Sequence, residues 1–344
     1  MKYRTYPNSD VTVSEVGFGL WTTSTGWWGE KTDDDAVALL HDAYDLGITF
    51  YDAADTYGNG RSEEQLAKAF RDRRDRVVYA TKFGYDIYSK DPNARRGQFE
   101  LPQDFSPAFV RRALEESLRR LETDHVDIYQ MHNARMAQIE DDALWSLLED
   151  LKREGKIRMY GVALGPAIGW LFEGVDAIEK RNCPSLQIIW NMLERFPGNE
   201  QIKAAYGAQA DTGYMIRVPH SSGMLEGHYT AETVFAENDH RRHRPRSWLL
   251  NGIQKIEQLR FLERPDRTLG QAAIQWLLAE PRVMTVLPNI YDAVQLREFA
   301  SAPQAPALTD DELARVDDLY ANNFGIKEEP SSFKGTMTRD AVSA

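Results

Sequence analysis

Three apolar segments of this chain lead into ionisable residues: ITFYDAADTYG (residues 48–58), VVYATKFG (77–84) and VDIYQMH (126–132). In a β-strand, alternate side chains face the same side of the sheet. An apolar row therefore leads to Asp52 in the first segment, to Lys82 in the second and to His132 in the third. Tyr57 follows Asp52 by five residues, in the loop just above that strand. The spacing predicts that these four side chains share one active site.

The order of the predicted elements favours an α/β fold. Each strand-like run is followed by a helix-like run, which is typical of parallel strands joined by crossover helices. We expect eight strands, over residues 16–20, 48–52, 77–82, 126–131, 158–162, 186–190, 213–218 and 283–287. A turn signal at residues 7–10 predicts an N-terminal β-hairpin ahead of them. The pattern thus predicts a (β/α)8 TIM barrel with its catalytic residues at the C-terminal rim.

Helix starts and an apolar stripe support this alternation. Thr32 precedes three aspartates, and Ser106-Pro107 precedes AFVRRALEESLRRLE, as is typical of helix N-termini. Within the second of these helices, apolar residues recur at helical spacing and predict core packing: Val110, Leu114, Leu118 and Leu121.

Two long polar segments interrupt the alternation, at residues 84–106 and 219–247, and we expect them to form rim loops near the site. We assign residues 1–321 to a single barrel domain. Residues 322–344 are polar with little periodicity and form a predicted C-terminal tail.

Composition excludes several classes of protein. The 344 residues include 41 lysines and arginines against 53 acidic residues, and the net charge of −12 opposes binding to nucleic acid or to anionic lipid. Cys183 is the single cysteine, so no intrachain disulfide and no cysteine cluster for zinc can form. The sequence begins without a secretion signal and holds no apolar stretch of about 20 residues. We expect a soluble cytoplasmic protein without metal, nucleic-acid or membrane partners, and leave its oligomeric state open.

The four converging residues suit proton transfer. Tyrosine ordinarily titrates near pH ~10, so a tyrosine that works as an acid near neutrality needs neighbours that stabilise its phenolate. Lys82 would supply positive charge, Asp52 would keep that lysine charged, and His132 would add a hydrogen-bond donor. Taken singly, each residue is more often structural than catalytic, and their convergence is what favours catalysis. Together they could protonate a carbonyl oxygen while a reductant delivers hydride to the carbonyl carbon.

These segments resemble the signature sequences of the aldo-keto reductases, and the resemblance extends over nearly the whole chain. ITFYDAADTYGNGRSEEQLAKAF is similar to the family's stretch around its aspartate and tyrosine, ATKFG to the one with its lysine, and DIYQMHN to the one with its histidine. The resemblance implies a (β/α)8 barrel that uses NADP or NAD without a metal. It also implies a catalytic tetrad of Asp52, Tyr57, Lys82 and His132, with Tyr57 as the proton donor.

The nicotinamide end of the implied cofactor site departs from the family's pattern. Ala163 and Leu164 replace the Ser-Asn pair that holds the carboxamide, although the family's next marker is present as Gln187. Arg217 stands where the family commonly has an aromatic residue that stacks on the nicotinamide ring. Arginine can also stack, but its charge would disfavour the cationic oxidised cofactor. It could instead bind an anionic substrate or a phosphate.

Other segments correspond to the family's contacts with the rest of the dinucleotide. His220 and Ser222 occupy the stretch that touches the pyrophosphate, and residues 221–223 could present backbone N–H groups to an anion. The basic run HRRHRPR at 240–246 is either a solvated loop or a second phosphate-binding segment.

After the eighth strand, Asn289, Gln295 and Glu298 correspond to contacts with the adenosine part, Glu298 being the implied adenine contact. Relatives that prefer NADP place basic residues here against the ribose 2′-phosphate, whereas Arg297 is one step displaced from that pattern. The missing charge removes a strong reason to prefer NADP over NAD.

Aromatic residues mark the expected substrate side. Trp21 and Trp27, on the rim of the first strand, and Tyr85, in the next rim loop, are candidates to contact a carbonyl compound or a sugar. For Trp27 and Trp28, ordinary packing is an equal alternative, because adjacent residues of an extended segment point apart.

We therefore expect an oxidoreductase that interconverts carbonyls or sugars with alcohols by hydride transfer from a nicotinamide cofactor. Two alternatives remain open from the sequence. One is a regulatory barrel that senses a cofactor without significant turnover. The other is redox-neutral lyase or isomerase chemistry on a sugar, with the same tyrosine acting as a base.

Overall fold

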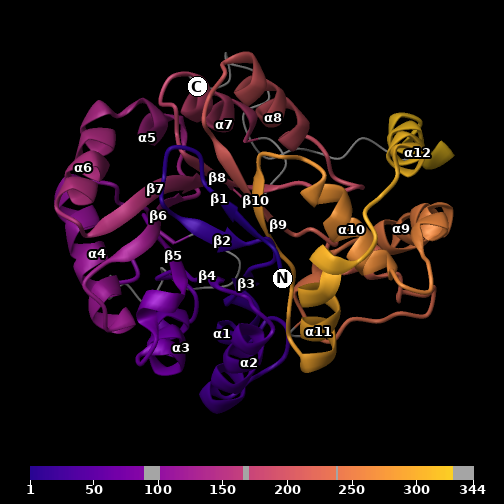
Figure 1. Ribbon diagram of the computed structural model, residues 1–344, viewed down its shortest axis with the longest axis horizontal. Helices are drawn as coiled ribbons and strands as arrows, with labels where there is room; N and C mark the ends of the chain where they lie inside the picture. The colour runs from indigo at the N-terminus through magenta and orange to yellow at the C-terminus, as the bar shows by residue number, and fades with distance from the viewer. Residues whose placement is uncertain (89–100, 166–169, 238, 328–344) are drawn as a thin grey trace.

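The computed structural model describes residues 1–88, 101–165, 170–237 and 239–327, and within these it forms a barrel of eight parallel strands (Figure 1). In sheet order the strands are β3 (Phe18–Gly19), β4 (Phe50–Asp52), β5 (Val78–Phe83), β6 (Val126–His132), β7 (Ile157–Ala163), β8 (Ser185–Ile189), β9 (Gly213–Arg217) and β10 (Val283–Leu287). Between the first and last strands the barrel closes through a bridge from Val16 to Val286. There Gly17 N donates to the Val286 carbonyl at 2.9 Å. The predicted TIM barrel is confirmed.

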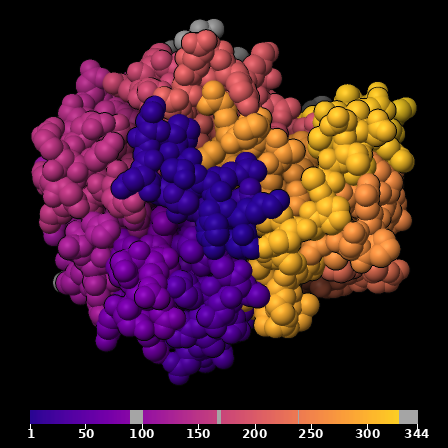
Figure 2. Space-filling view, in the orientation of Figure 1, coloured from indigo at the N-terminus to yellow at the C-terminus, as the bar shows by residue number. Residues whose placement is uncertain are grey.

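An antiparallel hairpin of β1 (Tyr3–Thr5) and β2 (Thr12–Ser14) closes the N-terminal end of the barrel. Figure 2 shows this N-terminal segment over the centre of one face. Its buried side chains pack against residues that begin several barrel strands, among them Phe50, Val78 and Met284. Because apolar side chains fill this end, the polar strand ends at the opposite rim are left to form the site.

Helices follow the strands and surround the barrel (Figure 1). The α-helices are α1 (Trp21–Ser24), α2 (Asp33–Asp45), α3 (Arg61–Phe70), α4 (Pro107–Leu121), α5 (Met136–Glu140), α6 (Asp142–Arg153), α7 (Leu171–Glu179), α8 (Gly198–Gly207), α9 (Arg246–Leu259), α10 (Leu269–Leu278), α11 (Ala293–Ser301) and α12 (Asp310–Ala321). The 3-10 turns are η1 (Arg74–Arg76), η2 (Met224–Glu226), η3 (His240–His243), η4 (Arg260–Leu262), η5 (Ala302–Gln304) and η6 (Asn323–Gly325).

Both helix starts predicted from the sequence are confirmed. The Thr32 side chain accepts a hydrogen bond from the Asp35 N–H, and the Ser106 side chain accepts one from the Phe109 N–H. The predicted apolar stripe of α4 is buried in the core: Val110, Leu114, Leu118 and Leu121.

The strand boundaries differ most from prediction at the first two strands, which are shorter than expected. Val16 makes only an isolated bridge, and the strand ends at Gly19 because α1 begins at Trp21. Ile48 was expected to begin the second strand, but its N–H donates to the Ala43 carbonyl at the end of α2. In both cases the strand is limited by a neighbouring helix, α1 after the first strand and α2 before the second.

The predicted rim loops and tail are described in part. The two ends of the 84–106 loop pair with each other, since Asp104 N donates to the Gly84 carbonyl at 2.8 Å, while residues 89–100 lie outside the described residues. Phe324 is buried against the core, and the predicted tail from residue 328 onward lies outside the described residues. The assignment of residues 1–321 to one domain stays a prediction. None of the described helices is long and apolar enough to cross a membrane.

Candidate active site

Asp52 and Lys82 form a buried ion pair at the C-terminal ends of β4 and β5. Lys82 Nζ donates to Asp52 Oδ2 at 2.6 Å and to the Ala53 carbonyl at 2.7 Å. Burial alone would lower the pKa of Lys82, but the Asp52 carboxylate and the Tyr57 phenol outweigh it and raise that pKa. The site therefore holds a permanent ammonium group at the rim.

Tyr57 and His132 lie beside this ion pair. Lys82 Nζ is 4.7 Å from the centroid of the Tyr57 ring, and the Tyr57 and His132 ring centroids are 6.0 Å apart. Burial, followed by the charges of Lys82 and Arg217, lowers the pKa of His132 well below its usual value. The imidazole is thus neutral near pH 7 and can donate a hydrogen bond. The structure brings the four residues together, as the sequence predicted.

Two glutamines, one from β6 and one from β8, orient Asp52 across the inside of the barrel. Its Oδ1 accepts from Gln130 Nε2 at 3.1 Å and from Gln187 Nε2 at 3.0 Å, and both glutamines are buried. The side-chain amide of Gln187 thus donates a hydrogen bond to Asp52. Its contact with a nicotinamide carboxamide stays a prediction. Gln130 was not among the predicted site residues, although strand alternation places it on the same face as His132.

Tyr85 lies against the histidine of the tetrad. The Tyr85 and His132 ring centroids are 5.1 Å apart, and the Tyr85 hydroxyl accepts from Asn133 Nδ2 at 2.7 Å. The loop after β5 therefore brings a predicted substrate contact to the catalytic end of the barrel.

Arg217, the last residue of β9, adds a second positive charge. One of its Nη groups donates to the Leu164 carbonyl at 2.6 Å, while its Nε is buried without a hydrogen-bond partner. Burial lowers the pKa of Arg217, and the nearby Tyr57, Asp52 and Tyr85 oppose that shift. Within the described ranges no carboxylate forms an ion pair with Arg217. Its guanidinium is available to an anionic or π-rich ligand.

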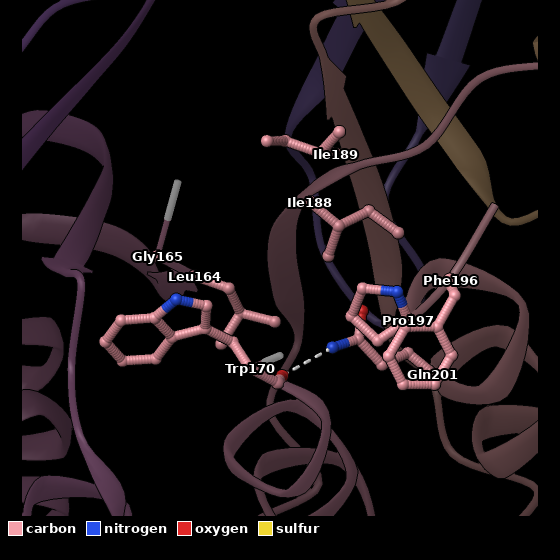
Figure 3. Close-up of a pocket in the computed structure, with 8 residues that line it drawn as sticks. All are labelled: Leu164, Gly165, Trp170, Ile188, Ile189, Phe196, Pro197 and Gln201. Carbon is pink, nitrogen blue, oxygen red and sulfur yellow. Dashed lines mark hydrogen bonds between the residues drawn. The ribbon is translucent and has the colours of Figure 1, made fainter. Parts of the chain in front are cut away.

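A small, largely apolar cavity lies beside Leu164, close to the start of α7 and α8 (Figure 3). It is lined by Leu164, Gly165, Trp170, Ile188, Ile189, Phe196, Pro197 and Gln201. Gln201 Nε2 donates to the Trp170 carbonyl at 2.9 Å across it. Leu164, whose carbonyl accepts from Arg217, thus adds an apolar side chain to the wall of this cavity.

The segment after β9 has features of an anion-binding loop. Ser221, Ser222 and Gly223 have φ angles of 48°, 58° and 90°, so three consecutive residues adopt the left-handed conformation. Arg244, from the basic run, reaches this loop: its Nη2 donates to Ser222 Oγ at 3.3 Å, and its Nε is buried without a partner. A buried guanidinium donor that lacks a partner fits a phosphate group. This contact favours phosphate binding by the basic run over a purely solvated loop.

His220 is packed beneath that loop. Its ring stacks on Phe299 at a centroid distance of 4.5 Å, and Nε2 lies 3.0 Å from the Gly270 carbonyl. Nδ1 is buried without a partner. Burial lowers the pKa of His220 to about 4, so the ring is neutral near pH 7.

This histidine makes folding sensitive to acid. Its pKa is about 4 in the folded protein and about 6.5 when exposed, so the unfolded chain gains a proton first as the pH falls. His220 should therefore cost up to about 1.4 kcal/mol of stability per pH unit between pH ~6.5 and pH ~4, and no more outside that range. In urea unfolding at pH 7 and pH 5.5, His220→Gln should lose less stability with acid than the parent. The exposed His228→Gln is the control, and equal losses in all three proteins would refute this.

The residues assigned to adenosine lie around α11. Gln295 Nε2 donates to Glu226 Oε2 at 3.0 Å, and Glu298 Oε1 accepts from the Thr268 hydroxyl at 2.6 Å. Asn289 is partly buried in the loop after β10. Arg297 is exposed and, two residues after Gln295, does not share its helix face. Glu226 was missed by sequence analysis because nothing in its local sequence indicates burial beside a helix so distant in the chain.

The loop after β9 also meets the aromatic rim of the first strand. The Trp21 and His240 ring centroids are 4.9 Å apart, and the Trp27 carbonyl accepts from the His240 N–H at 3.1 Å. Trp28 stacks on Tyr291 with a centroid distance of 5.7 Å, whereas Trp27 is 40% exposed. The adjacent tryptophans thus differ in environment, and the substrate contacts proposed for Trp21 and Trp27 stay predictions.

Comparison with known proteins agrees with this geometry. The Aldo/keto reductase family model matches residues 15–321. The uncharacterized oxidoreductase YqkF of Bacillus subtilis is 29% identical over 324 residues, which cover 91% of this chain and 94% of YqkF. The NADH-specific methylglyoxal reductase of Escherichia coli is 27% identical over 310 residues, which cover 86% of this chain and 91% of that reductase.

A solved structure shares the whole architecture. The holo form of aldo-keto reductase AKR11C1 from Bacillus halodurans is 28% identical and superposes with a TM-score of 0.74, covering 93% of this chain and 96% of that one. The chain belongs to the aldo/keto reductase family. It is an oxidoreductase by family, as its tetrad geometry suggests.

Proposed function

We propose that this protein reduces carbonyl compounds or sugars, reversibly, with hydride from NADH or NADPH, and that it acts in the cytoplasm. The observation that carries the proposal is the buried Asp52–Lys82 ion pair directly beside Tyr57 and His132. An ammonium and a neutral imidazole flanking a phenol form an arrangement suited to proton transfer at a carbonyl oxygen.

Each tetrad residue has a role that follows from its contacts. Tyr57 gives its proton to the substrate oxygen, and the Lys82 ammonium stabilises the negative charge that develops on the phenol oxygen. His132, kept neutral by burial and by the neighbouring cations, donates a hydrogen bond to the same substrate oxygen. Asp52 positions Lys82 through one oxygen and is itself held by Gln130 and Gln187 through the other.

The residues present fit a dinucleotide. The loop at Ser222 and the unpartnered Nε of Arg244 would hold its pyrophosphate, and Gln295 and Glu298 would hold its adenosine. Arg217 lies next to Tyr57, where it would contact the nicotinamide ring. When bound, the cofactor supplies the hydride.

A direct test is to titrate the purified protein with NADH and with NADPH while following tryptophan fluorescence. Trp28 stacks on Tyr291, next to the proposed adenosine site, so binding should quench its emission saturably. We expect at least one dinucleotide to bind with micromolar or tighter affinity. Absence of binding by both would overturn the proposal.

Arg217 should make the protein discriminate between oxidation states. A guanidinium beside the nicotinamide ring repels the positive charge that this ring carries only when oxidised. Arg217→Leu should therefore tighten binding of the oxidised cofactor by about tenfold, equivalent to about 1.4 kcal/mol, and leave binding of the reduced cofactor nearly unchanged. Calorimetric titration of both forms checks this, with Arg153→Leu, an exposed arginine at the end of α6, as the control. Equal changes for both forms would contradict it.

A further inference from the structure

Glu226 has a free carboxylate oxygen at the proposed adenosine site. It ends the 3-10 turn η2, which follows the anion-binding loop directly, and its Oε2 accepts from Gln295 on α11 at 3.0 Å. Its Oε1 has no hydrogen-bond partner in the part of the chain that the structure describes. This acceptor therefore lies between the segment assigned to the pyrophosphate and the helix assigned to adenosine.

The charged groups that act on Glu226 are two carboxylates and one arginine that is already hydrogen-bonded. Burial is the main reason why the pKa of Glu226 is raised to about 7; Glu298 and Asp292 add to the rise, and Gln295 and Arg241 oppose it. Arg241 is already committed to Asp239, to which it donates at 2.8 and 2.6 Å, and to the Tyr229 hydroxyl. The local charge is therefore negative once Glu226 is ionised.

The residue at position 291 is a tyrosine and adds no positive charge beside Glu226. Tyr291 lies in the stretch between β10 and α11, and its ring is fixed by stacking on Trp28. Arg297 on α11 is exposed and two residues along from Gln295, so it does not share the face of α11 that holds Glu226. Neither Tyr291 nor Arg297 therefore places a positive charge on that face of α11.

We infer that Glu226 makes this protein select NAD(H) over NADP(H), by accepting a hydrogen bond from the adenosine ribose hydroxyl. The inference rests on the proposed function. A carboxylate acceptor suits a ribose 2′-hydroxyl, whereas it repels a 2′-phosphate and offers that phosphate no donor. Gln295 holds the glutamate in place through Oε2 and leaves Oε1 to face the sugar.

The test is to measure dissociation constants for NADH and NADPH by calorimetry in the full-length protein and in Glu226→Gln. The parent should bind NADH about 100-fold more tightly than NADPH, a difference of about 2.7 kcal/mol. Glu226→Gln keeps the size of the side chain but removes its charge, so it should strengthen NADPH binding by about tenfold and weaken NADH binding severalfold. Glu232→Gln, an exposed glutamate of the same loop, should change neither.

A pH series adds a second readout. Glu226 ionises around neutrality. The ratio of the NADPH to the NADH dissociation constant should therefore rise more steeply between pH 6 and pH 8 in the parent than in Glu226→Gln. A parent that prefers NADPH, or a Glu226→Gln variant whose preference stays within twofold of the parent's, would overturn the inference while the proposed function stands. Failure of both dinucleotides to bind would instead overturn the proposed function and this inference together.

Discussion

Replacing Tyr57 by phenylalanine should reduce turnover about 1,000-fold while changing affinity for the reduced cofactor less than about threefold. Positioned general acids contribute roughly 10²–10⁴-fold to rate, and the substitution removes only the hydroxyl that gives the proton. The Lys82–Asp52 pair keeps its hydrogen bond in the variant, because that contact does not involve Tyr57. The ring and its packing against His132 also remain.

The measurement is steady-state turnover together with a binding titration of the cofactor. Tyr85→Phe is a matched control, because Tyr85 lies against the same histidine, on its own loop, and its hydroxyl accepts from Asn133 Nδ2. We expect it to lose less than about tenfold in turnover, in line with a positioning role. A Tyr57→Phe variant that keeps more than about a tenth of the parent's turnover would exclude Tyr57 as the proton donor.

Breaking the buried ion pair should cost both stability and turnover. Asp52→Asn leaves the Lys82 ammonium buried without its counter-ion, and removal of one partner of such a pair typically costs about 3–5 kcal/mol. Lys82→Met leaves the Asp52 carboxylate buried in the same way. The double variant removes both charges, so its loss of stability should be clearly smaller than the sum of the two single losses.

Urea unfolding of the four proteins measures this coupling, and turnover is measured alongside it. The exposed pair Lys68–Asp34 provides the control, since its removal should change stability by less than about 1 kcal/mol. Additive losses in the double variant would show that the two side chains do not depend on each other. Retained turnover in Lys82→Met would show that the ammonium is not needed for the chemistry.

The sequence predicted where Asp52, Lys82 and His132 lie because strand alternation depends on local order. Asp52, Lys82 and His132 end three buried rows, and parallel strands bring such ends to one rim whatever the loops do. Boundaries were less predictable where a helix competes for the same residues, as at Ile48, whose N–H belongs to the end of α2. Local apolarity cannot distinguish these two outcomes.

The cofactor side was harder to predict because its contacts join distant segments. Glu226 meets Gln295, 69 residues away, and Trp28, which follows the first strand, meets Tyr291, which follows the last strand, where the barrel closes. Gln187 shows the same limit: its hydrogen bond to Asp52, 135 residues away, was not indicated by its local sequence. Such pairings are set by tertiary packing of the rim loops, and no local pattern encodes them.

The most direct test of the proposed function is to measure, in one reaction, how much reduced cofactor is oxidised and how much alcohol is formed. Protein loaded with its preferred reduced cofactor would be mixed with a panel of aldehydes, ketones and sugars, and oxidation of the cofactor compared with formation of alcohol. We expect one cofactor oxidised for each alcohol formed with at least one carbonyl, and loss of both signals in Tyr57→Phe. Cofactor that binds but is never oxidised, or product formed without a change in nicotinamide absorbance, would contradict the account.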